Sequence, residues 1–260
     1  MEWQIASQTH VGKVRAINED ALLVVKDYPL LAVADGMGGH QAGEVASQMI
    51  VDDLADLHLE SALEQAQAQT ERALLNTNQK IVEYRARELR GQTVGSTVVT
   101  MLAKKDRAVC IWAGDSRLYR IRDNSIEQLT EDHSHVAELV RDGLITPEEA
   151  RNHPSSNMIT RAVGVADELA LSVKSLTVCP GDTYLLCSDG LYGEVDEAEI
   201  LQTVLSADVY RSSVQLLNRC LQRRAKDNIT FILGHAAASS NGDPEYDETL
   251  IDNTVTRFGG

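Results

Sequence analysis

The distribution of apolar and polar positions predicts strands at the start of the chain, then two helices, then strands again. Three short runs near the start are typical of strands: residues 3–10, 20–26 and 30–34. Residues 43–57 and 61–89 follow, with apolar positions at helical spacing. Ser61 and Glu64 have the spacing of a capping box, so we expect the second helix to begin there.

A second series of strands follows these helices, at residues 94–103, 107–113, 117–122 and 125–129. Antiparallel hairpins are favoured by turns at Lys105-Asp106 and Asp123-Asn124. Residues 131–158 are polar and partly helical, and a helix start is marked there by Thr146, Pro147 and Glu149. Two strands, two helices and a last strand complete the pattern, at residues 168–178, 183–188, 196–205, 208–224 and 228–235.

The order of these elements does not follow the regular alternation of a parallel sheet. It favours antiparallel sheets with helices on their outer faces, an α+β layered domain. Beyond this domain the composition changes, because residues 237–260 carry five acids, one arginine and few residues of the core type. We therefore expect a folded domain over residues 1–236 and a disordered acidic tail over residues 237–260.

Composition and charge exclude several classes of protein. The 260 residues include 24 Lys and Arg against 39 Asp and Glu, and this net charge of −15 disfavours nucleic acid as a partner. No apolar run approaches the ~20 residues needed to span a bilayer, so we expect no membrane attachment. The four cysteines form no CxxC pair and lie in apolar surroundings, so we expect reduced thiols and a cytoplasmic location. Because the sequence shows neither a membrane segment nor an evident extra domain, we expect a monomer.

The candidate chemistry lies in carboxylates at strand ends. Asp35 ends the apolar run 30–34 and enters a turn that contains Gly36, where glycine permits a close approach by a ligand. Five further acids lie in comparable positions: Glu19, Asp20, Asp115, Asp189 and Asp227. Each alone is typical of a turn or a cap, but six together indicate a shared metal site. Ligands that are all oxygens favour Mg²⁺ or Mn²⁺, and an acid-rich site suits two-metal hydrolysis.

Eight motifs in order make the chain similar to a known family. They are RAINED, VADGMGGHQAGEVAS, GSTVV, AGDSRLYRI, LTEDHS, ITRAVG, LLCSDGLY and DNIT. The chain resembles the metal-dependent protein phosphatases of the type-2C class in their compact bacterial form, over roughly residues 5–235. The resemblance implies a four-layer sandwich: two antiparallel β-sheets packed face to face, flanked by helix pairs, with a flap subdomain at about residues 135–158.

The resemblance also implies roles for individual residues. Asp35 would bridge two ions, and the remaining ligands would be Asp189, Asp227 and the backbone carbonyl of Gly36. Waters on these ions would be held by Glu19, Asp20 and Thr97. A third, weaker site would be formed by Asp115 with Asp189. The cofactor would be Mn²⁺ or Mg²⁺, with two ions in the core site.

The implied reaction is hydrolysis of phosphoserine and phosphothreonine on proteins, by attack of a water or hydroxide that bridges the metal ions. Arg15 would hold the substrate phosphate, which suits a planar guanidinium. His40 is a candidate proton donor to the leaving group, although a histidine in a glycine loop can equally pack or cap the next helix. Met37 departs from the family pattern, because animal members tend to have a histidine at this position. Gly193 departs from it as well, because many members have an acid there that orients a metal-bound water.

Two alternatives remain open from the sequence. One is a catalytically weak phosphatase fold that acts as a binding module, and the other is a two-metal hydrolase of small phosphoesters. The favoured function opposes serine/threonine kinases, so the expected partners are phosphorylated proteins, in particular a Ser/Thr kinase and its targets.

Overall fold

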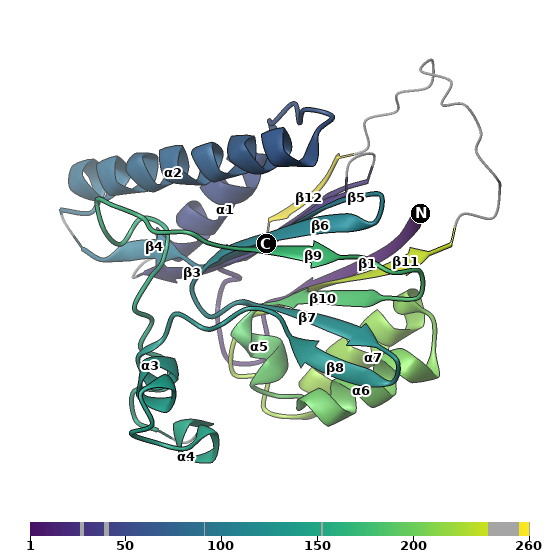
Figure 1. The fold of residues 1–260 in the computed structure, drawn as a ribbon. Helices are drawn as coiled ribbons and strands as arrows, with labels where there is room; N and C mark the ends of the chain where they lie inside the picture. The colour runs from purple at the N-terminus through teal and green to yellow at the C-terminus, as the bar shows by residue number, and fades with distance from the viewer. Residues whose placement is uncertain (27–28, 39–41, 91, 152, 239–254, 260) are drawn as a thin grey trace.

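The computed structural model describes residues 1–26, 29–38, 42–90, 92–151, 153–238 and 255–259. Two β-sheets pack face to face, and helices cover both outer faces (Figure 1). One sheet has the strand order β1 (Glu2–His10), β11 (Ile229–Ala237), β10 (Thr183–Cys187), β7 (Arg117–Arg122) and β8 (Ser125–Gln128). We call it the first sheet.

The second sheet has the order β12 (Val255–Gly259), β2 (Asp20–Val25), β3 (Leu30–Gly38), β5 (Val98–Lys104), β6 (Arg107–Ala113) and β9 (Ser172–Thr177). Strand β4 (Val94–Ser96) pairs with the end of β3. Every pairing in both sheets is antiparallel. This arrangement confirms the predicted α+β fold with two antiparallel sheets and flanking helices.

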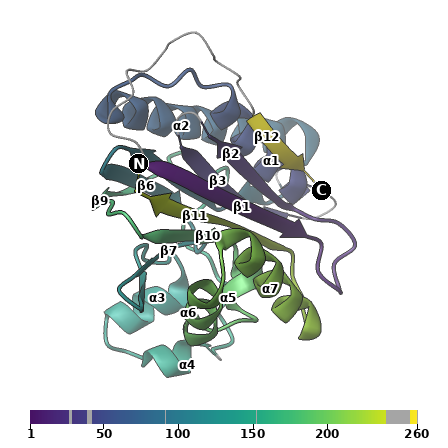
Figure 2. The ribbon, with the colours of Figure 1, turned by 90° about the vertical axis from the view of Figure 1, so that its right-hand side faces the viewer.

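The helices form the two outer layers (Figures 1 and 2). The second sheet is covered by α1 (Ala42–Ala55) and α2 (Leu63–Glu88). The first sheet is covered by α5 (Asp189–Tyr192), α6 (Glu197–Ser206) and α7 (Val209–Gln222). Two short helices, α3 (His135–Arg141) and α4 (Pro147–Arg151), stand apart from the sandwich within the predicted flap segment.

Strand β3 shows why the central strands are apolar throughout. Leu30 and Ala32 belong to the core beneath α1 and α2, whereas Leu31 and Val33 belong to the core between the sheets. Side chains alternate across a strand, so a strand covered on both faces needs apolar residues at every position. The uninterrupted run therefore ends only where the chain leaves the core, at Asp35.

Three local predictions differ from the structure. The capping box at Ser61 and Glu64 is wrong: the N-cap of α2 is Ala62, no side chain caps it, and Glu64 instead forms an ion pair with Arg107 at 2.7 Å. The single strand predicted over residues 94–103 is divided into β4 and β5 around Thr97. Helix α5 was not predicted, because four residues are too few to show a helical period.

The C-terminal end differs from the expected disorder where the structure describes it. Val255–Gly259 forms β12, which pairs with β2, and Ala237 is the last residue of β11. The sequence VTRF contains residues that favour strands, and β2 provides an edge for pairing. Residues 239–254 lie outside the described residues. No helix in the described parts of the chain is both long enough and apolar enough to cross a bilayer.

Candidate active site

The strand ends that carry the six acids meet at one end of the sandwich. Asp20, the first residue of β2, pairs directly with Asp35 in β3. Asp189 follows β10, and the Ser188 hydroxyl next to it donates to Asp20 Oδ2 at 2.9 Å, so the first and second sheets contact each other here. Asp20, Asp115, Asp189 and Asp227 all act electrostatically on Asp35. The structure therefore brings the predicted acids together.

Backbone hydrogen bonds fix Asp35 and Gly36 in place. The Asp35 N–H donates to Thr97 Oγ1 at 3.2 Å, and the Thr97 N–H donates to the Asp35 carbonyl at 2.9 Å. The Gly36 N–H donates to the Glu19 carbonyl at 3.1 Å. A Cβ at Gly36 would lie 2.2 Å from the carbonyl oxygen of Gly43, so only glycine permits this close approach to α1.

Glu19 is held from both sides of the site. Its N–H donates to the Asn228 side chain at 2.8 Å, and its carboxylate accepts a hydrogen bond from the Gly43 backbone. Burial raises the pKa of Glu19, and the positive charge of Arg15 only partly offsets this. The start of α1 and the start of β11 therefore determine where this carboxylate lies.

Asn228 joins distant parts of the chain behind the acids, and sequence reasoning missed it. Its side-chain amide donates to the carbonyls of Val11 at 2.9 Å and Ile17 at 3.0 Å, and its backbone N–H donates to Asp227 Oδ1 at 2.9 Å. The asparagine is buried and all four of its polar contacts serve the loop before β2 or Asp227. The motif DNIT contains Asn228, but the residues adjacent to it in the sequence do not indicate these hydrogen-bond partners.

Gly190 provides a test of the packing behind Asp189. A Cβ at this position would lie 1.8 Å from the backbone oxygen of Asn228. We expect Gly190→Ala to lower the free energy of unfolding by about 3 kcal/mol. The added methyl group would push apart the backbones of Gly190 and Asn228, and such a shift would displace the neighbouring Asp189 and Asp227. Gly181→Ala is the matched control: its φ of +96° strains alanine, but no atom lies within 4 Å, so we expect a loss of about 1 kcal/mol. Urea unfolding of both variants measures the difference, and equal losses would contradict the crowding argument.

The electrostatics of the site favour a bound cation. Burial, reinforced by neighbouring carboxylates, raises the pKa of Asp115 to about 7 and that of Asp189 to about 6. Burial likewise raises the pKa of Asp20 to about 7, although hydrogen bonds from Thr230 and Ser188 lower it in part. The pKa of Asp35 rises well above its ordinary value for the same reason, and its carboxyl shares a hydrogen bond with Asp189.

The residues present fit divalent metal ions in charge and in donor type. The cations beside the acids are already engaged: Arg15 Nη2 lies 2.7 Å from Asp227 Oδ2, and Arg117 is paired with Asp132. Hard ions bind carboxylate oxygens, and such an ion would replace the proton that Asp35 and Asp189 share. In the described part of the chain no three acids, histidines or cysteines converge as a formed ligand cage. The carboxylates instead form a concentrated region of negative charge that meets solvent at Asp35 and Asp189.

The other predicted residues divide into three groups. Arg15 lies at the rim with half of its side chain exposed, in a position to meet a substrate from solvent. Thr97 Oγ1 contacts the Ser116 hydroxyl at 2.6 Å and accepts from the Asp35 N–H, so it supports Asp35. His40 lies outside the described residues, and the structure says nothing about its role.

Gly193 and His133, the histidine of the LTEDHS motif, have structural roles. Gly193 is the C-cap of α5, and its N–H donates to the Asp189 carbonyl at 2.8 Å. The adjacent Glu194 directs its carboxylate to the Arg224 backbone at 3.3 Å, away from the acids. His133 Nδ1 accepts from the Gly114 N–H at 3.0 Å, and burial lowers the pKa of its imidazole to about 4. It is therefore a neutral structural residue.

Comparison with known proteins identifies relatives over nearly the whole domain. The family model for protein phosphatase 2C matches residues 8–233. The serine/threonine phosphatase stp of Listeria welshimeri is 37% identical over 240 residues, which cover 87% of this chain and 93% of that protein.

Solved structures agree with this similarity. The structure of PppA, described as a key regulatory component of T6SS in Pseudomonas aeruginosa, has a TM-score of 0.84 and 41% identity, covering 91% of this chain and 98% of that one. The catalytic domain of the serine threonine protein phosphatase PstP, in complex with 2 manganese ions, has a TM-score of 0.80 and 34% identity. Its alignment covers 91% of this chain and 99% of the PstP chain.

Proposed function

Because the chain belongs to the protein phosphatase 2C family, it is a metal-dependent serine/threonine protein phosphatase, and we propose that the six acids of the candidate active site carry its reaction. The single observation that supports this placement is that Asp20, Asp35, Asp115 and Asp189 meet Asp227 at one end of the sandwich. Burial and the neighbouring carboxylates raise the pKa values of Asp20, Asp35, Asp115 and Asp189 there. A cluster of this kind is stable in its charged form only with bound cations.

In this proposal two Mn²⁺ or Mg²⁺ ions would be held by Asp35, Asp189, Asp227 and the Gly36 carbonyl. Asp115 and Asp189 would hold a third ion more weakly. Bound divalent ions offset the negative charge of the cluster and of the phosphate, and lower the pKa of water towards neutrality. The protein's contribution is to fix the positions of the acids, through Thr97 for Asp35 and through Asn228 for Glu19 and Asp227.

The side chains around the acids bind and orient the reactants. Glu19 and Asp20 would accept hydrogen bonds from the waters on the metal ions. The Arg15 guanidinium, half exposed at the rim, binds two phosphate oxygens at once and offsets their charge as the phosphorus–oxygen bond breaks. His40 remains our candidate for protonating the leaving serine or threonine oxygen.

Phosphorylated proteins are the substrates of this enzyme, and we propose that they include a serine/threonine kinase and its targets. We further propose a monomer in the cytoplasm. The four cysteines are unpaired, which suits a reducing compartment, and the net charge of −15 disfavours a nucleic acid partner.

Substituting Arg15 tests the proposed placement. We expect Arg15→Lys to raise KM for a phosphothreonine peptide about tenfold and to change kcat less than about threefold, because lysine keeps the charge but loses the two-point contact. The assay compares Mn²⁺, Mg²⁺ and excess EDTA, and EDTA is expected to abolish turnover. Arg120→Lys is the matched control, because Arg120 pairs with Glu127 on the surface of β7 and β8.

Two outcomes would contradict the proposal. An unchanged KM in Arg15→Lys would remove Arg15 from the phosphate site. A kcat/KM for p-nitrophenyl phosphate equal to that for the peptide would favour a hydrolase of small phosphoesters.

A further inference from the structure

The loop that carries Arg15 rests on the C-terminal end of α7. We define the Arg15 loop as residues 11–18, between β1 and β2, and the segment beneath it as the α7–β11 turn, residues 223–228. Figure 2 shows this loop leaving β1 beside α7. The Arg15 side chain is half exposed and contacts Asp227 at 2.7 Å. The backbone of the loop therefore determines where the guanidinium meets a substrate.

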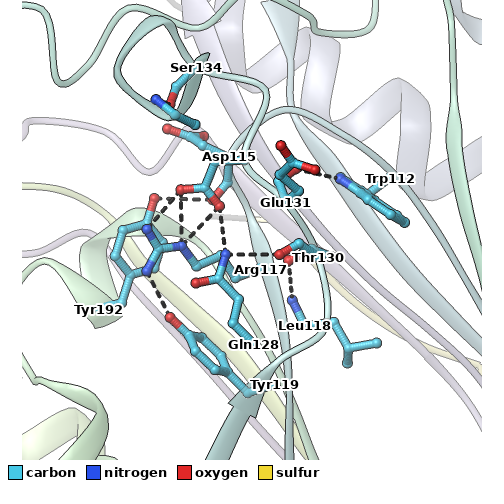
Figure 3. A network of polar contacts seen from close by, with 12 residues as sticks. Trp112, Asp115, Arg117, Leu118, Tyr119, Gln128, Thr130, Glu131, Ser134 and Tyr192 are labelled. Carbon is cyan, nitrogen blue, oxygen red and sulfur yellow. Dashed lines mark hydrogen bonds and ion pairs between the residues drawn. The ribbon is translucent and has the colours of Figure 1, made fainter. Parts of the chain in front are cut away.

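Arg15 is the more accessible of two arginines at the acids. Arg15 and Arg117 both act electrostatically on Asp189. Figure 3 shows that Arg117 is enclosed by protein: its guanidinium lies over the Tyr192 ring, with Cζ 3.7 Å from the ring centre, and donates to the Tyr119 hydroxyl at 2.8 Å. Its side chain is 22% exposed, against 50% for Arg15. A phosphate that enters from solvent is therefore expected to contact Arg15 rather than Arg117.

Gly12 places the Arg15 loop directly on the α7–β11 turn. Its φ is +83°, and a Cβ there would lie 2.2 Å from the Asp227 carbonyl oxygen and 2.9 Å from that of Ala225. Only glycine permits two backbones to approach this closely. The Gly12 N–H donates to His10 Nδ1 at 2.9 Å, so the last residue of β1 holds the start of the loop.

Lys13 attaches the loop to α7 at three points. Its N–H donates to the Ala225 carbonyl at 2.8 Å. Its Nζ donates to the Arg223 carbonyl at 2.8 Å and to the Leu221 carbonyl at 3.3 Å. The last carbonyls of a helix lack partners within the helix and lie at the negative end of its dipole, so they favour a lysine ammonium. Both the main chain and the side chain of Lys13 therefore bind the end of α7.

The residues that follow Lys13 form a short exposed arch. Residues 14–16 are all exposed. The arch ends at Ile17, whose carbonyl accepts from the Asn228 side chain at 3.0 Å, and the next residue, Asn18, is buried and donates to Thr9 Oγ1 at 2.7 Å. Arg15 therefore lies at the centre of an arch whose two ends, Lys13 and Ile17, are held by hydrogen bonds.

From this geometry we propose that Lys13 and His10 are positioning residues for the reaction, because they hold the Arg15 loop on the end of α7 and thereby place the Arg15 guanidinium for the substrate phosphate. The inference rests on the role that the proposed function gives Arg15. Lys13 supplies donors to the helix carbonyls, and His10 supplies an acceptor to Gly12. Loss of either contact lets the exposed arch move, which weakens the phosphate contact and leaves the acids in place.

Kinetics with a phosphothreonine peptide gives the first test. We expect Lys13→Met, which keeps an unbranched side chain and loses the donors, to raise KM about fourfold and to change kcat less than about twofold. The inhibition constant for inorganic phosphate should rise by the same factor, because phosphate contacts Arg15 without the rest of the peptide. Lys13→Arg keeps the donors and should return both constants to within about 1.5-fold of the wild type.

Two kinetic outcomes would overturn the inference. A raised KM with an unchanged phosphate inhibition constant would mean that Lys13 contacts the peptide itself. A Lys13→Arg variant with the constants of Lys13→Met would mean that the hydrogen bonds to the helix carbonyls do not matter.

A double-mutant cycle separates positioning from direct attraction, because removing the Lys13 ammonium also removes a positive charge near the substrate. In an Arg15→Ala background Lys13 has no guanidinium to position. We therefore expect Lys13→Met to change KM less than about 1.5-fold in that background. A fourfold effect that persists without Arg15 would show direct attraction and overturn the inference.

His10 is tested through its acceptor. His10→Leu loses the Nδ1 that accepts from the Gly12 N–H and should raise KM about threefold. His10→Asn keeps an acceptor, because an asparagine Oδ1 accepts from the N–H two residues later, and should hold KM within about 1.5-fold of the wild type. Equal effects from the two substitutions would remove His10 from the proposal.

The matched control is Lys174→Met. Lys174 Nζ donates to the Leu129 carbonyl at 3.0 Å, so the same kind of bond and the same charge are lost. Lys174 lies on β9, at the far edge of the second sheet from β2. We expect KM and the phosphate inhibition constant to stay unchanged. Equal effects from Lys174→Met and Lys13→Met would overturn the inference.

Arg15→Ala separates this inference from the proposed function. If Arg15→Ala raises KM and the phosphate inhibition constant and Lys13→Met changes neither, the positioning role is absent and the role of Arg15 stands. If Arg15→Ala changes neither constant, the assignment of Arg15 to the phosphate fails and takes the positioning role with it.

Discussion

Asp35→Asn is expected to lower kcat/KM for a phosphothreonine peptide by at least about 10³-fold while leaving the metal-free protein folded and more stable than the wild type. The loss of activity follows because the substitution removes the carboxylate that both core ions share in our proposal. The gain in stability follows because burial, reinforced by four neighbouring acids, raises the pKa of Asp35. Its protonated carboxyl shares a hydrogen bond with Asp189, and an asparagine amide can make the same donation without titrating.

We expect this gain to be of the order of 1–3 kcal/mol in EDTA at about pH 8, measured by urea unfolding. Activity is measured on the same preparation with saturating Mn²⁺. A variant that retains more than a tenth of the wild-type kcat/KM would contradict the shared-ligand role. A variant that is less stable than the wild type without metal would contradict the account of repulsion within the cluster.

Asp182→Asn is the matched control, because Asp182 is a buried aspartate outside the site. Burial raises its pKa, but hydrogen bonds from Arg122, the Cys179 N–H and Tyr184 outweigh this and hold the pKa below its ordinary value. The carboxylate is therefore needed in its charged form. We expect Asp182→Asn to cost about 2–3 kcal/mol of stability and to change kcat/KM less than about threefold, the reverse of Asp35→Asn on both counts.

The sequence predicted the acids of the site because each stands where an apolar run meets a glycine or an asparagine. Asp35 is the clearest case, since β3 is buried on both faces and the first carboxylate marks the edge of the core. Antiparallel order then follows from the element sequence alone. These features depend on neighbours along the chain, which a single sequence displays.

Contacts between distant residues could not be predicted in this way. Asn228 donates to carbonyls 217 and 211 residues away, and no local pattern marks those partners. Arg117 and Asp132 are 15 residues apart, so their pairing depends on the path of the chain from β7 through β8 to the segment before α3. The predicted capping box failed for a related reason, since Glu64 has a cross-element partner in Arg107.

The metal-free protein is expected to lose stability as the pH rises from about 5 to about 8. Asp20 and Asp115 have pKa values raised to about 7, and Asp189 to about 6, chiefly by burial. Between the ordinary aspartate pKa near 4 and these values, the folded protein binds more protons than the unfolded chain. Raising the pH therefore favours unfolding across this interval, and the loss from Asp20, Asp115 and Asp189 levels off about one pH unit above these pKa values.

His133 opposes this trend, so its contribution has to be separated from that of the acids. Burial lowers the pKa of His133 to about 4, so the unfolded chain binds the extra proton between about pH 4 and pH 6.5, and stability gained there offsets part of the loss. Asp115→Asn keeps His133 and removes one titrating acid. The difference between the wild type and this variant therefore isolates the contribution of Asp115, which we expect to be roughly 2 kcal/mol between pH 5 and pH 8.

Metal binding should reverse the pH dependence, because a cation and a proton compete for the same carboxylates. A ligand that binds only the folded state stabilises it in proportion to the logarithm of its concentration over its dissociation constant. Mn²⁺ is therefore expected to add more stability at about pH 8, where the acids are charged, than at about pH 5. Urea unfolding in EDTA and in Mn²⁺ at both pH values measures this. Metal-free stability that stays constant or rises between about pH 5 and pH 7 would contradict the raised pKa values of the buried acids. If Mn²⁺ stabilised the protein equally at both pH values, the buried acids would not be the groups that hold the ions.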